Sequence, residues 1–185
     1  MQLFTEFFAS VPWFLPGMLV WAPAALLLTP TVADALRSNR LVVFAMLISF
    51  GGVVLATLTP TSVALSVGAP QAEWCDLDRM ALPPLSELLA AHDTLRNVLL
   101  FIPLGLTLGL LGRTRRAGAM VIAAYALPFV IETLQLALPG MGRGCQSADL
   151  IDNAIGLTLG LVAGGTLRIA ADQISRQGRG TTASP

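Results

Sequence analysis

Five long apolar stretches, separated by polar connectors, dominate the pattern along the chain. They run from Val11 to Leu28, Leu41 to Leu58, Thr94 to Leu111, Ala117 to Leu138 and Leu150 to Ala170. A helix needs roughly 20 apolar residues to cross the hydrocarbon core of a bilayer. The pattern therefore predicts an all-α fold, a polytopic transmembrane helix bundle with five membrane-spanning helices.

The same pattern divides the chain into four parts. We expect an N-terminal two-helix hairpin over residues 1–58, an outer connector over 59–93, a three-helix core over 94–170 and a disordered tail over 171–185. In the connector, Pro83 and Pro84 precede the string LSELLAAH, which predicts a short helix with Leu85, Leu88 and Leu89 on one stripe. This segment either rests in the membrane interface or is a plain amphipathic linker.

Composition supports a membrane protein and excludes several other classes. The chain has 185 residues, of which 55% are hydrophobic and 12% charged, and its formal net charge is zero. Soluble domains carry about 25% charged residues. These values exclude a disordered chain, a coiled coil and a nucleic-acid binder, and they argue against an ordinary globular enzyme. Residues 1–10 contain no Lys or Arg, so the first apolar stretch does not resemble a cleaved signal peptide.

The arginines, which are the only cationic side chains apart from one histidine, are distributed unequally between the connectors. Arg79 and Arg143 lie in the second and fourth connectors, and Arg96 lies just inside the third stretch. Because cytoplasmic connectors are enriched in Arg and Lys, we expect a multi-pass protein of the cell membrane, with the N-terminus outside and the C-terminus cytoplasmic. The other eight occupy the first and third connectors and the tail: Arg37, Arg40, Arg113, Arg115, Arg116, Arg168, Arg176 and Arg179.

Polar side chains interrupt the last three stretches at one common depth. Each of these stretches carries a pair of polar residues three or four positions apart, which places the pair on one helix face. At a rise of 1.5 Å per residue, Asn97 and Asn153 lie roughly 6 Å, and Glu132 roughly 10 Å, inside the outer boundary. With the nearby arginines they form a predicted binding cluster: Asp93, Arg96, Asn97, Glu132, Gln135, Arg143, Asp149 and Asn153.

Glu132 is the acidic residue of this cluster that lies deepest in a predicted span. A lone charge in a membrane helix costs at least about 2.5–3.5 kcal/mol, so Glu132 is expected to face the bundle interior and to have a partner. Arg96 or Arg143 could supply the opposite charge, and Asn97, Gln135 or Asn153 could supply hydrogen bonds. Alternatively, these polar groups only hold the helices together through interhelical hydrogen bonds, which contribute about 0.6 kcal/mol each.

Cys75 and Cys145 both fall in connectors that the arginine distribution places outside. An oxidising compartment permits a disulfide between them, and an even number of cysteines leaves no unpaired thiol. Such a bond would hold the long connector over the polar cluster. Two independent thiols are the alternative.

Other chemistry-bearing patterns are weak. Gly105 with Gly109, and Gly156 with Gly160, form GxxxG pairs, which we interpret as helix packing. His92 lies beside Asp93 at the membrane boundary, where it is either a surface histidine or a general base. The sequence has no zinc-ligand spacing, Walker loop or Gly-x-Ser-x-Gly elbow, so it predicts neither a metal nor a cofactor.

Three strings in the second half of the chain resemble the VanZ-like family. They are D-x3-N-x3-F-x-P-x-G from Asp93, an E-x-x-Q pair at Glu132, and R-x5-D-x3-N-x2-G from Arg143. They cover about residues 93–165 in family order, and the first two stretches carry no family signature. The resemblance implies a membrane protein with a link to resistance against teicoplanin-type glycopeptides, which act on lipid-linked wall precursors outside the membrane.

Two functional hypotheses follow, and both place the site at the polar cluster. In the first, a non-enzymatic protein binds a membrane lipid head group or a lipid-linked wall precursor. In the second, an intramembrane enzyme acts on a lipid-linked substrate, with Glu132 or Asp149 as the acid or base and an arginine holding an anionic group. A transporter is less well supported, because the stretches show no internal repeat.

Overall fold

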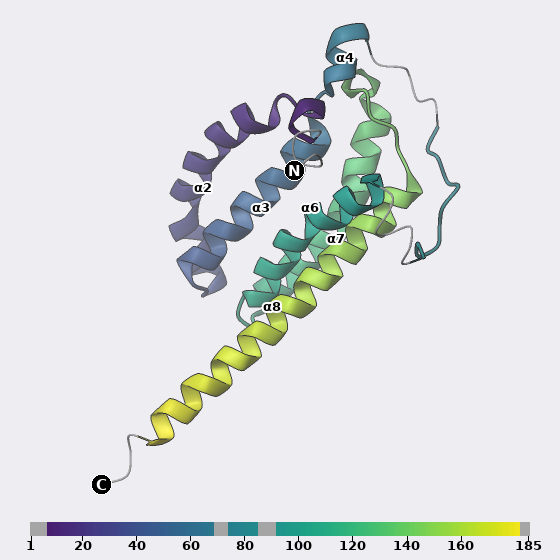
Figure 1. Ribbon diagram of the computed structural model, residues 1–185. Helices are drawn as coiled ribbons and strands as arrows, with labels where there is room; N and C mark the ends of the chain where they lie inside the picture. Colours follow the sequence, from purple (N-terminus) through teal and green to yellow (C-terminus); the bar gives the residue numbers. More distant parts are fainter. Residues whose placement is uncertain (1–6, 69–73, 85–91, 182–185) are drawn as a thin grey trace.

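The structure is a computed structural model that describes residues 7–68, 74–84 and 92–181. It is all-helical, and five of its helices are long and apolar enough to cross a membrane, as the sequence predicts (Figure 1). These helices are α2 (Phe14–Leu36), α3 (Arg40–Leu58), α6 (His92–Leu110), α7 (Arg115–Ala137) and α8 (Ser147–Thr181). Two short elements, α4 (Ser62–Val67) and the 3-10 turn η1 (Pro139–Met141), lie in the connectors. The expected interfacial helix at Leu85, Leu88 and Leu89 falls outside the described residues.

Two helices are longer than the apolar stretches that predict them. Helix α2 continues eight residues beyond Leu28, to Leu36. Helix α8 continues beyond Ala170 to Thr181 and extends past the rest of the bundle in Figure 1, so the expectation of a disordered tail is wrong for residues 171–181. The physical reason is that the polar residues there include Gln and Arg, which favour helix almost as strongly as Ala does, and no proline interrupts them.

Helices α6 and α8 form the closest pair in the bundle. Glycines on each helix lie against the backbone of the other, so that a Cβ at any of them would collide with a facing main-chain carbonyl oxygen. Small residues allow this close approach in membranes, where packing rather than hydrophobic transfer drives helix association. The glycines involved are Gly105, Gly109, Gly156, Gly160 and Gly164.

Helices α2 and α3 form a hairpin that joins this pair through α3. The indole Nε1 of Trp21 donates a hydrogen bond to the main-chain oxygen of Leu47 at 2.8 Å, and the ring covers Gly51. Val43 and Val53 of α3 are fully buried in the same core as Phe101 of α6. The described helices therefore share an apolar core, with α3 between α2 and the glycine-rich pair.

Arginines close the end of the bundle opposite α4. Arg116 donates to the main-chain oxygen of Ala35 at 2.7 Å, near the end of α2. Arg168 donates to the main-chain oxygen of Leu111, just after α6. Helix ends leave carbonyl groups without intrahelical partners, and cationic side chains satisfy them favourably. These contacts fix the ends of α2 and α6 against α7 and α8.

Candidate functional site

A polar cavity of about 360 Å³ lies at the end of the bundle that carries α4. Its walls come from residues near the N-terminus, the end of α3, the start of α6, the end of α7 and the connector before α8. The polar faces of the last three spanning helices therefore meet at one end of the bundle. The sequence predicts a common depth for their polar residues. Six of the eight cluster residues line the cavity: Asp93, Arg96, Asn97, Gln135, Arg143 and Asp149.

Interhelical hydrogen bonds order the side chains on the cavity wall. Asn97 of α6 donates through Nδ2 to Oδ1 of Asp149 in α8, at 2.6 Å. Gln135 of α7 donates through Nε2 to the main-chain oxygen of Thr57, at 3.0 Å. That oxygen is available because α3 ends one residue later, at Leu58. Oε1 of Gln135 is buried and has no hydrogen-bond partner among the described residues.

Arg143 enters the cavity from the turn between α7 and α8. Gly142, with a φ of 64°, provides the left-handed turn before it, and a Cβ there would press against Thr61 and Ala64. Nε of Arg143 donates to the main-chain oxygen of Thr59 at 3.3 Å, whereas Nη2 is buried without a partner in the described part of the chain. Burial lowers the pKa of the Arg143 guanidinium, and the carboxylate of Asp149 raises it. Arginine remains protonated in proteins, so the turn presents a positive charge to the cavity.

Arg96 and Asp93 form a weaker pair at the rim of the cavity. Nη1 of Arg96 lies 3.4 Å from Oδ1 of Asp93, whose side chain is 94% exposed. His92 begins α6 beside this pair, but its side chain lies outside the described part of the structure. Among the described residues, no group of three or more His, Cys, Asp or Glu is placed to hold a metal ion.

Glu132 and Asn153 do not line the cavity. Glu132 is 3% exposed, and its Oε2 accepts a hydrogen bond from the main-chain N–H of Gln146 at 2.7 Å. The expected charge partner, Arg96 or Arg143, is thus replaced by a backbone amide next to the first turn of α8, where N–H groups lack intrahelical partners. Asn153 is 2% exposed, and its Oδ1 has no partner among the described residues.

The most buried ion pair of the described chain was not among the predicted site residues. Nη2 of Arg79, in the long connector, donates to Oδ2 of Asp152 at 2.6 Å and to Oγ1 of Thr94 at 3.5 Å. The side chain of Asp152 is only 1% exposed. Asp152 could have been found from its position three residues after Asp149, on the same helix face. Arg79 carries no local signal, because 73 positions separate it from its partner.

A disulfide holds the long connector to the turn before α8. It joins Cys75 and Cys145, whose Cα atoms are 4.6 Å apart, within the usual range for a bonded pair. Asp76 pairs with Gln146 in a short parallel bridge next to it. In this bridge, the N–H of Asp76 donates to Cys145 and the N–H of Ser147 donates to Asp76, both at 2.8 Å. The connector that carries Arg79 is therefore fixed beside the cavity.

Comparison with known protein families gives a match over most of the chain. The model of the VanZ/LLP1 family matches residues 18–168, which includes the first two spanning helices as well as the last three. No curated protein and no solved structure matches the chain.

Proposed function

Because the chain belongs to the VanZ/LLP1 family of multi-span membrane proteins, we propose that its polar cavity binds the anionic head group of a membrane lipid or of a lipid-linked wall precursor. The observation that carries this proposal is the buried Nη2 of Arg143, which has no protein partner in the described chain. A buried donor of this kind is costly to leave unsatisfied. An anionic oxygen in the cavity would satisfy it.

The remaining polar groups suit a phosphate-bearing head group that also carries hydroxyl or amide donors. The planar guanidinium of Arg143 favours phosphate oxygens, and Arg96 brings a second positive charge to the same cavity. Gln135 and Asp149 also line the cavity. Oε1 of Gln135 and the carboxylate of Asp149 are acceptors, so they can receive hydrogen bonds from sugar or glycerol hydroxyl groups.

Two independent features support an orientation with the cavity in the outer leaflet, the N-terminus outside and the C-terminus in the cytoplasm. Eight of the eleven arginines lie in the connectors and tail assigned to the cytoplasmic side. The disulfide lies at the cavity end, and disulfides persist on the oxidising side of the cell membrane. In this orientation the cavity faces the compartment in which glycopeptides meet lipid-linked precursors, which would connect head-group binding to the resistance suggested by the family name.

An enzymatic alternative rests on Asp149. Of the two acids considered for acid–base chemistry, Asp149 lines the cavity, whereas Glu132 lies behind it and accepts a backbone hydrogen bond. An Asp149→Asn variant separates the two functions. A binder should retain its lipid, since Asn still offers an acceptor, whereas an enzyme that uses this carboxylate should convert no substrate.

Mass spectrometry of lipids that co-purify with the intact protein tests the proposal. We expect an anionic lipid or lipid-linked precursor with the wild-type protein and its loss, by at least tenfold, from Arg143→Gln. Arg113→Gln is the matched control, because Arg113 is exposed at the other end of the bundle. Equal amounts of anionic lipid with both variants would contradict the proposal.

A further inference from the structure

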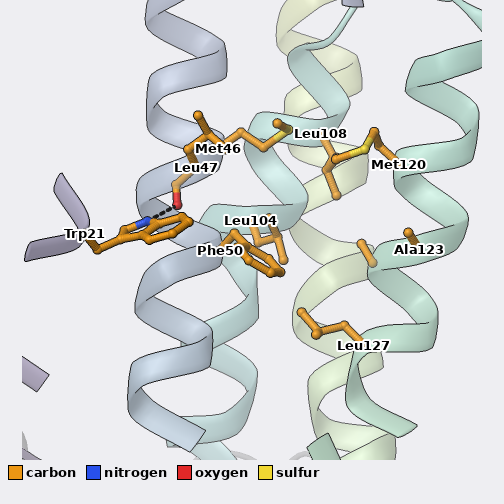
Figure 2. A pocket seen from close by; sticks show the side chains of 10 residues that line it. Trp21, Met46, Leu47, Phe50, Leu104, Leu108, Met120, Ala123 and Leu127 are labelled. Carbon is orange, nitrogen blue, oxygen red and sulfur yellow. Dashed lines mark hydrogen bonds between the residues drawn. The ribbon is translucent and has the colours of Figure 1, made fainter. Parts of the chain in front are cut away.

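A second cavity, of about 210 Å³, lies deeper in the bundle between α3, α6 and α7 (Figure 2). Its walls are entirely apolar side chains, with the ring of Trp21 from α2 at one edge. The indole N–H of Trp21 is already bonded to the main-chain oxygen of Leu47 at 2.8 Å. The lining side chains therefore have no donor left to offer a polar ligand, and we call this cavity the apolar groove.

The apolar groove is open on one side. Leu104 and Leu108 of α6 form its floor and are 3% and 4% exposed. Phe50 of α3 and Met120 of α7, on its two walls, are 38% and 37% exposed. In Figure 2 the labelled side chains of α3 and α7 lie on either side of the space in front of α6. The opening therefore faces the surface between α3 and α7, which in a membrane is occupied by lipid.

Hydrocarbon is the most favourable occupant of the apolar groove. Water does not occupy a cavity that offers it no hydrogen-bond partners. An empty cavity loses the dispersion contacts that its lining atoms would otherwise make. The groove exceeds the roughly 150 Å³ of a cavity known to hold benzene, so it has room for a segment of a lipid chain.

The apolar groove and the polar cavity are lined by the same three helices, α3, α6 and α7. The groove lies further from the end of the bundle that carries α4. On α6, Leu100 lines the polar cavity and Leu104 lines the groove, one helical turn apart and on the same face. On α7, Gln135 and Leu127 hold the corresponding positions, roughly 12 Å apart along the axis. Between the two levels lie Val53 and Ile131, which are 0% and 1% exposed.

We infer that one lipid occupies both sites, with its anionic head in the polar cavity and one hydrocarbon chain in the apolar groove. The buried side chains of Val53 and Ile131 separate the two cavities, so the hydrocarbon chain passes around them on the lipid-facing surface of the bundle. This inference rests on the proposed function for the head group and adds the substrate class. The ligand is an amphiphile recognised through its head and its chain together, rather than a water-soluble anion.

A matched pair of variants on α7 tests the chain site. Ala123 lines the groove, and Ala123→Trp would fill it. Its neighbour Ile122 is 73% exposed and does not line the groove, so Ile122→Trp adds the same ring outside the groove. Circular dichroism and gel filtration check that each variant folds, and Ala123→Phe replaces Ala123→Trp if the larger ring prevents folding. The intact, delipidated protein is titrated with dioleoylphosphatidylglycerol, followed by native mass spectrometry, and with glycerol 3-phosphate, followed by calorimetry.

We expect Ala123→Trp to weaken binding of the lipid at least tenfold and to leave binding of glycerol 3-phosphate unchanged. Ile122→Trp should change neither, and Arg143→Gln should weaken both. Unchanged lipid binding by Ala123→Trp, or equal affinity of the wild-type protein for the two probes, would overturn the chain site while leaving the head-group site intact. Unchanged binding of both probes by Arg143→Gln would instead overturn the proposed function, and the two-part site with it.

Discussion

At the scale of single residues, buried charges and amides hold the cavity end of the molecule together. Asp152 is nearly inaccessible, and Arg79 lies 2.6 Å from it. Removing one member of a buried ion pair leaves an uncompensated charge, which is far more costly than losing an exposed pair. The ion pair of Arg79 therefore holds the long connector to α8, in addition to the disulfide that holds it to the preceding turn.

Replacing Arg79 by Met should lower the free energy of unfolding by about 3–5 kcal/mol, because the Asp152 carboxylate loses its ion pair. Reversible unfolding in mixed micelles measures the change. Asp93→Asn is the control, since the side chain of Asp93 is 94% exposed and its pair with Arg96 should contribute less than about 1 kcal/mol. Similar losses for the two variants would show that the Arg79–Asp152 pair does not stabilise the protein.

Glu132 should tolerate an isosteric amide but not an apolar side chain. Glu132→Gln keeps an oxygen that can accept from the N–H of Gln146, whereas Glu132→Leu leaves that partly buried N–H without its acceptor. We expect Glu132→Leu to destabilise the protein by about 1–3 kcal/mol more than Glu132→Gln does. Lipid co-purification should survive Glu132→Gln. A Gln variant that unfolds as readily as the Leu variant would disprove this role.

At the scale of elements, the contact between α6 and α8 organises the bundle. Both helices contribute glycines to it, and the two backbones approach closely where those glycines face each other. This interface also brings Asn97 and Asp149 together near the N-terminal ends of the two helices. Packing along the glycine stripe therefore determines the geometry of the cavity wall.

Gly160→Ala should destabilise the protein by about 1–3 kcal/mol, because its Cβ would collide with the main-chain oxygen of Ile102 on α6. Gly165→Ala is the matched control on the same helix, because nothing lies within 4 Å of a Cβ there. The control should be neutral or slightly stabilising, since Ala favours helix by up to about 1 kcal/mol over Gly. Thermal unfolding of both variants measures the difference, and equal stabilities would refute close packing at Gly160.

The spanning helices were predictable because each is an apolar stretch of the length that a bilayer requires. The gathering of the polar faces of α6, α7 and α8 at one end was also predictable, since depth along a helix follows from the rise per residue. Depth alone did not predict that Glu132 and Asn153 do not line the cavity. What local pattern cannot encode is how connectors fold back. The hydrogen bond from Gln146 to Glu132 and the ion pair of Arg79 with Asp152 both depend on connector paths. The helical continuation of α8 was missed because its polar composition resembles that of a disordered tail.

At the scale of the whole molecule, the two ends of the bundle differ in chemistry. One end carries the polar cavity, the disulfide and the connector that holds Arg79. At the other end, arginines satisfy the final carbonyl groups of α2 and α6. The proposed orientation, with the disulfide end outside and the arginine-rich end inside, is consistent with this difference.

Thiol labelling of intact cells tests the disulfide and the orientation in one experiment. Without reductant, a membrane-impermeant maleimide should label neither Cys75 nor Cys145, because they are bonded to each other. After a membrane-impermeant reductant, it should label both, because the proposed orientation places both outside. Labelling before reduction would disprove the disulfide. A protein that is labelled only after the cells are lysed and reduced would have the opposite orientation.

In the proposed function, the polar cavity holds an anionic head group through Arg143. The most direct measurement is an experimental structure of the intact protein in a bilayer that contains phosphatidylglycerol. We predict density for a phosphate group within hydrogen-bonding distance of Nη2 of Arg143, with the head group in the cavity at the end of α7. A cavity that contains only water, or is closed by protein side chains, with lipid phosphates confined to the outside of the bundle, would contradict the account.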